Sequence, residues 1–355
     1  MNMKFIAIAV AAATVSIPAS AATVYQDDNT VFNVGGRAEV RGNISDANKE
    51  FDDTGVETND STYKDKSRVR LTVDGKQTYN SDITFVGKYE FELTEKTDGG
   101  SDDVAMNTRH LYAGAETSFG DIFYGHQVNA VTYLTDWTDV AETFSGYTNE
   151  YNVATADRAK NMLRYATTTS YGLTFQVDGN FNSDQQSDGY GAIVAYELPI
   201  GLELGAGYAA SDQTFDQTIT TLDSSGDPIT TPTYETDSSD TYLLAAKYAN
   251  DGIWLAAMYQ GGNISALGIS DSDFSAVDLY AGYSFGDNTV NMTYNYYSAD
   301  DIGALDIDFI GIEYARYMGS VALFGSYKFN LLDEGEGGEG DNDEDELQLG
   351  LRYGF

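Results

Sequence analysis

The chain ends in DELQLGLRYGF, where apolar and polar side chains alternate with a strict two-residue period. Apolar residues run along one face from Leu347 to Phe355, and polar residues or glycine run along the other from Glu346 to Gly354. A period of two predicts a β-strand with one apolar and one polar face. The same alternation recurs along the chain in runs of about ten residues, the length that crosses a bilayer as a tilted strand.

These runs predict sixteen strands. They span residues 31–45, 66–79, 83–95, 105–117, 121–127, 159–168, 172–182, 189–198, 201–211, 239–249, 252–261, 274–285, 288–299, 308–317, 320–330 and 345–355.

The connections alternate between short turns and long loops. The short ones carry turn residues, as in Asn250-Asp251-Gly252 and Gly286-Asp287, which favour tight hairpins. The long ones cover residues 46–65, 96–104, 128–157, 183–188, 212–238, 262–273, 300–307 and 331–345. An even strand number with short turns at one end and long loops at the other is typical of an outer-membrane β-barrel. Closing the sheet also removes the unpaired edges that a bilayer penalises.

Residues 1–21 have the pattern of a secretory signal peptide. Lys4 supplies the positive start, an apolar stretch follows from Phe5 to Ile17, and Ala19-Ser20-Ala21 is a small-x-small cleavage site. We therefore expect one domain, residues 22–355, in the exported protein. The rest of the chain has no apolar run long enough for a transmembrane helix.

The composition of the chain further limits which class of protein it belongs to. The chain has no cysteine, so disulfides do not hold it together. Its formal charge of −37 leaves no basic footprint and excludes nucleic acid as a partner. With 27 tyrosines and only four prolines, it has the material for long ordered strands.

The strand number also bears on function. Eight strands fill their interior with side chains, whereas sixteen leave an aqueous channel. The polar faces carry charged residues such as Arg70, Asp74 and Glu92, which are costly against lipid but tolerated against lumen water. The sequence therefore predicts a pore.

The whole predicted exported chain resembles the general diffusion porins of Gram-negative outer membranes. The resemblance is carried by VYQDDNTVFNVGGRAEVRG, SRVRLTVDGKQTYNSDITFVGKYEFE, NTRHLYAGAETSFGDIFYGHQ, TDWTDVAETFSG, DRAKNMLRYATTTSYGLTFQVDGNF and the final GLRYGF. It implies an all-β, 16-stranded antiparallel transmembrane β-barrel. Long extracellular loops, short periplasmic turns and an inward-folded third loop complete the expected fold.

In such porins, carboxylates of the third loop face basic side chains on the barrel wall across the narrowest point. The resemblance places this constriction at the wall residues Arg37, Arg70, Arg109, Arg158 and Arg164 and the loop residues Asp136, Asp139 and Glu142. The alternation puts Arg37 and Arg70 on the polar face, but Arg109 shares parity with the apolar Leu111. Spacing does not decide between Arg158 and Arg164. Ala141 replaces the family's usual proline, so the local loop shape departs from the pattern.

The resemblance also implies partners. These are a homotrimer, outer-membrane lipid and lipopolysaccharide, periplasmic chaperones, and a barrel-assembly machinery that recognises the C-terminal Phe355. The expected solutes are ions and small hydrophilic molecules, with a mild preference for cations because the chain is acidic. No cofactor or defined metal site is expected. The acidic segments 51–61 and 333–346 are solvated surface or loosely bind Ca²⁺ or Mg²⁺.

Other functions are less well supported. A hydrolase barrel needs a nucleophile beside an oriented base. The only histidines are His126 and His110, which shares parity with Tyr112 and is expected to face lipid or a neighbouring subunit. No G-x-S-x-G motif is present. A substrate-specific channel, or a structural or adhesin barrel with acidic surface loops, remains the alternative.

Overall fold

The computed structural model describes residues 21–51, 57–95, 104–149, 157–181, 188–222, 228–266, 269–300, 305–333 and 343–355. Sixteen strands form one antiparallel sheet in which each strand pairs with the next along the chain. They are β2 (Thr30–Ser45), β6 (Arg68–Asn80), β7 (Ile83–Glu95), β8 (Val104–Thr117), β9 (Gly120–Val128), β10 (Arg158–Thr168), β11 (Leu173–Asn180), β12 (Gly189–Glu197), β13 (Leu202–Leu222), β14 (Pro228–Asn250), β15 (Ile253–Ala266), β16 (Ile269–Phe285), β17 (Asn288–Ala299), β18 (Ile307–Met318), β19 (Val321–Asn330) and β20 (Glu346–Gly354).

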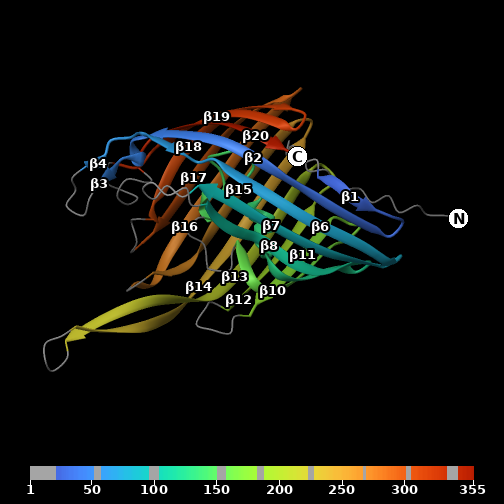
Figure 1. Ribbon diagram of the computed structural model, residues 1–355, viewed down its shortest axis with the longest axis horizontal. Coiled ribbons are helices and arrows are strands. Elements are labelled where there is room, and N and C mark those ends of the chain that lie inside the picture. Colours follow the sequence, from blue (N-terminus) through green and yellow to red (C-terminus); the bar gives the residue numbers. More distant parts are fainter. Residues whose placement is uncertain are drawn as a thin grey trace.

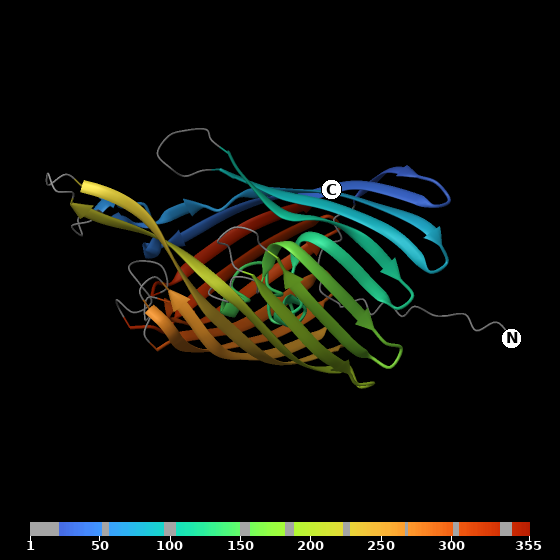
Figure 2. The same cartoon turned by 90° about the horizontal axis from the view of Figure 1, so that it is seen from below.

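The sheet closes where its last strand meets its first. Strand β20 pairs with β2 from Arg37↔Gly354 to Ser45↔Glu346, and Phe355 exchanges two backbone hydrogen bonds with Gly36. The short β1 (Ala22–Gln26) then pairs with β2 beyond the point where β20 has ended. The result is the barrel of Figures 1 and 2, which confirms the predicted fold and all sixteen predicted strands.

Alternation sorts the side chains of each strand between two environments. In β17, Thr289, Asn291 and Thr293 are buried inside the barrel, whereas Val290 and Met292 are exposed on the outside. The outer surface is therefore apolar and the inner surface polar, the reverse of a soluble protein. None of the helices in the described ranges is long and apolar enough to span a membrane.

Two connections differ from the prediction. Residues 212–222 and 228–238, expected to be loop, continue β13 and β14 as a paired ribbon as far as Leu222↔Pro228. This ribbon is the long hairpin that projects from the barrel in Figure 1. Likewise, β15 and β16 extend through much of the expected loop 262–273. Alternation fails to predict these parts because a ribbon in water on both sides needs no apolar face.

The tight turns are at the predicted places. Gly252 and Gly286 have φ values of 81° and 56°, a backbone conformation that glycine adopts without the steric cost of a Cβ atom. The remaining short elements are β3 (Glu50–Phe51), β4 (Glu57–Asn59), β5 (Tyr63–Asp65), α1 (Thr132–Thr135) and the 3₁₀ turns Asp46–Asn48 and Tyr147–Asn149. The predicted signal peptide, residues 1–20 of which lie outside the described ranges, stays a prediction.

The two faces of β17 predict different responses to the same charge. Met292→Lys places an ammonium group against lipid and is expected to destabilise the folded barrel in a bilayer by about 2–4 kcal/mol near the midplane. Thr289→Lys, on the inner face, is expected to cost much less. Denaturant titrations of folding into lipid vesicles measure both, and equal costs would contradict the assignment of the outer face.

Candidate functional site

A cavity of about 790 Å³ lies inside the barrel, between the loop that joins β9 to β10 and the wall formed by β2, β6, β8 and β20. We call this connection, residues 129–157, loop 3. Seven of the eight predicted constriction residues line the cavity: Arg37, Arg70, Arg109, Arg158, Asp136, Asp139 and Glu142. Residues that the prediction did not include also line it: Glu39, Arg41, Arg68, Tyr317 and Arg352.

Seven arginines line the cavity, and we call them the arginine row: Arg37, Arg41, Arg68, Arg70, Arg109, Arg158 and Arg352. The row begins on two neighbouring strands. Arg37 of β2 is directly opposite Arg70 of β6 in the sheet register, so both guanidinium groups project from the inner face at one level. Arg70 forms an ion pair with Glu92 of β7. Glu39 is 2.5 Å from Arg41 and 3.1 Å from Arg68 between the closest N and O atoms. These carboxylates hold the arginines in fixed positions along the wall.

A β-bulge explains how Arg109 reaches the interior despite its parity with Leu111. The register between β7 and β8 shifts after Glu90↔His110, and the next pair is Phe91↔Thr108, which leaves Arg109 unmatched. Arg109 and His110 both line the cavity, and Arg109 Nε donates to Glu90 Oε1 at 3.1 Å. The prediction that His110 faces outward is wrong. Leu111 is exposed on the outside, so its neighbour His110 faces inward by ordinary alternation, and the bulge brings Arg109 to the same side.

A second bulge separates the two candidate arginines of β10. The pairing with β9 shifts between Ala159 and Met162, and Asn161 between them has a φ of 53°. Arg158 lines the cavity beside Asp157, 2.6 Å away. Arg164 is not among the described cavity-lining residues, and its Nη2 instead donates to Gln176 Oε1 of β11.

Loop 3 packs against the wall opposite the arginines, because glycines in that wall leave space for side chains of the loop. A Cβ atom added at Gly205 of β13 would lie 2.3 Å from Leu134 Cδ2, and one at Gly207 would lie 3.3 Å from Leu134 Cδ1. Leu134, at 0% exposure, and Trp137 belong to a buried apolar cluster shared between the loop and strands β12 to β16. Figure 2 shows α1 inside the barrel.

Hydrogen bonds attach loop 3 to five strands of the same wall. The donor–acceptor pairs are Ala130 N to Asp178 of β11 (2.6 Å), Tyr133 to Glu203 of β13 (2.7 Å), Trp254 of β15 to Trp137 O (2.9 Å), Thr148 to Asp278 of β16 (2.7 Å) and Thr293 of β17 to Phe144 O (2.5 Å). The expected inward-folded third loop is confirmed, and the wall from β11 to β18 supports it.

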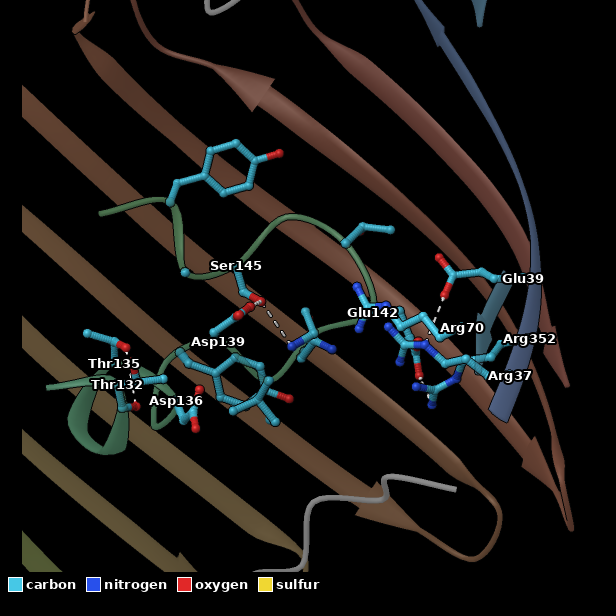
Figure 3. Close-up of a pocket in the computed structure, with 18 of the residues that line it drawn as sticks. Arg37, Glu39, Arg70, Thr132, Thr135, Asp136, Asp139, Glu142, Ser145 and Arg352 are labelled. Atoms are coloured by element: carbon cyan, nitrogen blue, oxygen red, sulfur yellow. Dashed lines mark hydrogen bonds and ion pairs between the residues drawn. The ribbon is translucent and has the colours of Figure 1, made fainter. Parts of the chain in front are cut away.

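The tip of loop 3 crosses to the arginine side. Glu142 Oε1 accepts from Arg352 Nη2 at 2.7 Å and from the Tyr317 hydroxyl at 3.2 Å, and the Glu142 carbonyl accepts from Arg41 at 2.7 Å. Figure 3 shows Glu142 among Arg37, Arg70 and Arg352. Arg352 lies on the polar face of the final strand. The alternation of that strand therefore already indicated that Arg352 faces the interior, where it meets Glu142.

Glu313 of β18 anchors the same tip from the opposite side. Its carboxylate, 3% exposed, accepts from the Glu142 N–H at 2.9 Å, the Thr143 hydroxyl at 3.1 Å, Asn291 at 2.9 Å and Ser326 at 2.8 Å. Four donors satisfy a buried charge. The sequence did not single out Glu313, because one carboxylate on a polar face resembles many others in an acidic chain.

Asp136 and Asp139 lie farther back along loop 3, as Figure 3 shows. Both side chains are exposed to the cavity, and Ser145 donates to Asp139 at 3.0 Å. The surrounding barrel disfavours charge here and, together with Asp139 and Asp157, raises the pKa of Asp136 to about 7. Burial also raises the pKa of Asp139, while the hydrogen bond from Ser145 opposes the rise.

No group of three or more His, Cys, Asp or Glu side chains suited to a metal ion occurs within the described parts of the chain. Much of both acidic segments, including residues 52–56 and 334–342, lies outside those parts. Loose binding of Ca²⁺ or Mg²⁺ there stays a prediction.

The comparisons agree with this geometry. The chain matches the Gram-negative porin family over residues 7–355. Porin-like protein L of Photobacterium profundum is 32% identical over 363 residues, which cover 100% of both chains. Salmonella typhi OmpF, solved in complex with daunomycin, has a TM-score of 0.74 at 22% identity and covers 94% of this chain and 100% of its own. The trimer form of Vibrio cholerae OmpT has a TM-score of 0.68 at 15% identity, covering 92% and 99%.

A closed sixteen-stranded barrel with an apolar outside, a charged inside and an inward loop defines a transmembrane channel protein. The chain belongs to the Gram-negative porin family. It is an outer-membrane channel for the diffusion of small solutes, and the proteins of this family are channels rather than enzymes.

The role of Glu313 gives a prediction about the open channel. Glu313→Ala removes the acceptor for two donors of the loop 3 tip, so the tip is expected to fluctuate and the single-channel current to become larger and noisier. Planar-bilayer recordings measure this. Ser326→Ala, which removes a donor to Glu313 but no loop contact, is the matched control. A Glu313→Ala channel with the current and noise of the unmodified protein would contradict the anchor.

Proposed function

We propose that the protein is a general diffusion porin in which loop 3 and the arginine row form the constriction. Solutes smaller than the gap pass in water, and the constriction residues are Arg37, Arg70, Arg109, Arg158, Asp136, Asp139 and Glu142. The observation that carries this proposal is the placement of loop 3. It is attached to one wall by buried contacts, while its tip reaches Arg352 and Arg41 on the other.

The charges within the cavity are nearly balanced. Seven arginines and five carboxylates line it, and the carboxylates of Glu90 and Glu92 pair with Arg109 and Arg70 at its margin. The narrow region therefore contributes a fixed transverse field more than a net charge. The overall charge of −37 then sets a mild preference for cations at the mouths.

We propose further that the protein is exported by the signal peptide at residues 1–21 and works as a homotrimer. A similar fold is known in a trimer form, that of V. cholerae OmpT. Phe355 would serve the barrel-assembly machinery. Its placement supports this role, because it ends the strand that closes the barrel.

Planar-bilayer recording in a potassium chloride gradient tests the proposed function. We expect ohmic conductance that appears in steps of three, with a reversal potential that favours K⁺. An anion-favouring reversal potential would overturn the selectivity. Silent insertion would indicate a structural barrel, and block by one particular solute would indicate a substrate-specific channel.

Asp136 predicts a pH-dependent selectivity. Because its pKa is raised to about 7, the carboxylate is charged at pH 8 and mostly neutral at pH 6, so K⁺ preference is expected to fall as the pH is lowered. In Asp136→Asn this pH response is expected to flatten, with the variant at pH 8 resembling the unmodified channel at pH 6. Asp82→Asn, in the turn after β6, is the control for charge removed elsewhere. An unchanged pH response in Asp136→Asn would refute the assignment.

A further inference from the structure

Lys247 of β14 is isolated in the sequence. It is the only lysine or arginine between Arg164 and Arg316, a stretch that includes 22 aspartates and glutamates and forms the wall behind loop 3. The proposed constriction uses the arginines of the opposite wall and gives Lys247 no role.

Lys247 is mostly buried, with 15% of its side chain exposed, and three groups surround its ammonium. Nζ lies 2.6 Å from Glu203 Oε2, on the residue directly opposite in β13. The same nitrogen is 4.7 Å from the ring centroid of Trp137 and 5.3 Å from that of Trp254. Lys247 therefore contacts the wall on two sides and loop 3 on the third.

The surrounding hydrogen bonds join the same groups. Trp254 Nε1 donates to the Trp137 carbonyl at 2.9 Å, and the Tyr133 hydroxyl donates to Glu203 Oε1 at 2.7 Å. Glu203 thus binds the wall cation with one oxygen and a loop residue with the other. We refer to Lys247, Glu203, Trp254, Trp137 and Tyr133 as the lysine clamp.

The lysine clamp depends on the charge of Lys247 and not only on the space that its side chain fills. Glu203 alone satisfies the charge of Lys247, so the position of the ammonium near both indole rings adds an attraction that depends on its charge. An apolar residue of equal length fills the same space without that attraction and leaves the largely buried Glu203 carboxylate with the Tyr133 hydroxyl but no cation. Arginine keeps the charge and is able to stack on the rings while pairing with Glu203.

We propose that Lys247 is the positioning residue for the first half of loop 3, residues 130–139. It holds Trp137 and Tyr133 against the wall and thereby fixes the place from which Asp136 and Asp139 line the passage. The clamp acts on the end of the loop remote from Glu142, so the two attachments together fix its path. This inference rests on the proposed function, in which loop 3 bounds the passage.

The experiment compares Lys247→Met with Lys247→Arg in the refolded full-length protein. The chain has two tryptophans, Trp137 and Trp254, and both belong to the clamp, so intrinsic fluorescence reports on it directly. In Lys247→Met we expect a shift of the emission maximum, stronger quenching by acrylamide, and added current fluctuations in planar bilayers. Lys247→Arg is expected to restore all three. Lys76→Met, which removes a lysine paired with Glu116 far from loop 3, is the matched control and should leave all three unchanged.

Two outcomes would overturn the proposal: fluorescence and current noise in Lys247→Met equal to those of the unmodified protein, or failure of Lys247→Arg to restore either. If Lys247→Met does not fold, Glu203→Gln tests the same clamp through its carboxylate, with the same expected changes. If the unmodified protein does not conduct, the proposed function fails, and fluorescence alone still decides whether Lys247 holds the loop.

Discussion

The structure depends on one constraint, which is that backbone groups facing lipid have no water to bind and must pair with one another. The pairing of β20 with β2 completes this requirement, since it joins the last strand of the barrel to the first. Closure with sixteen strands then produces an interior too wide for wall side chains alone to fill. The channel and the need for a loop to narrow it both follow from that width.

Loop 3 gives the barrel the buried core that its walls lack. Gly205 and Gly207 make space for Leu134, and Glu313 receives the backbone and side chain of the loop tip. Because these contacts lie on β11 to β18, the wall around Arg37 and Arg70 stays open to the cavity. The asymmetry that separates acidic loop from basic wall is thus a consequence of where the loop packs.

The charged side chains that line the cavity are held in place by ion pairs, and their charges nearly cancel. Glu39 and Glu92 are ion-paired to the arginine row, so the guanidinium groups have fixed directions. In the proposed function, a nearly neutral but strongly polarised passage suits solutes of either sign. This arrangement agrees with a channel for unspecialised diffusion.

Alternation along the chain was sufficient to predict the barrel, all sixteen strands and the inner position of Arg37 and Arg70, because lipid on one side and water on the other impose a period of two. It did not predict the bulge that brings Arg109 inside, the inner position of His110, or that the cavity includes Arg158 but not Arg164. It also did not predict Glu313 or Lys247 as supports of loop 3. Strand parity is a local property and follows from the sequence alone, whereas a bulge or a loop contact depends on residues brought together from distant strands, and only the tertiary structure decides those.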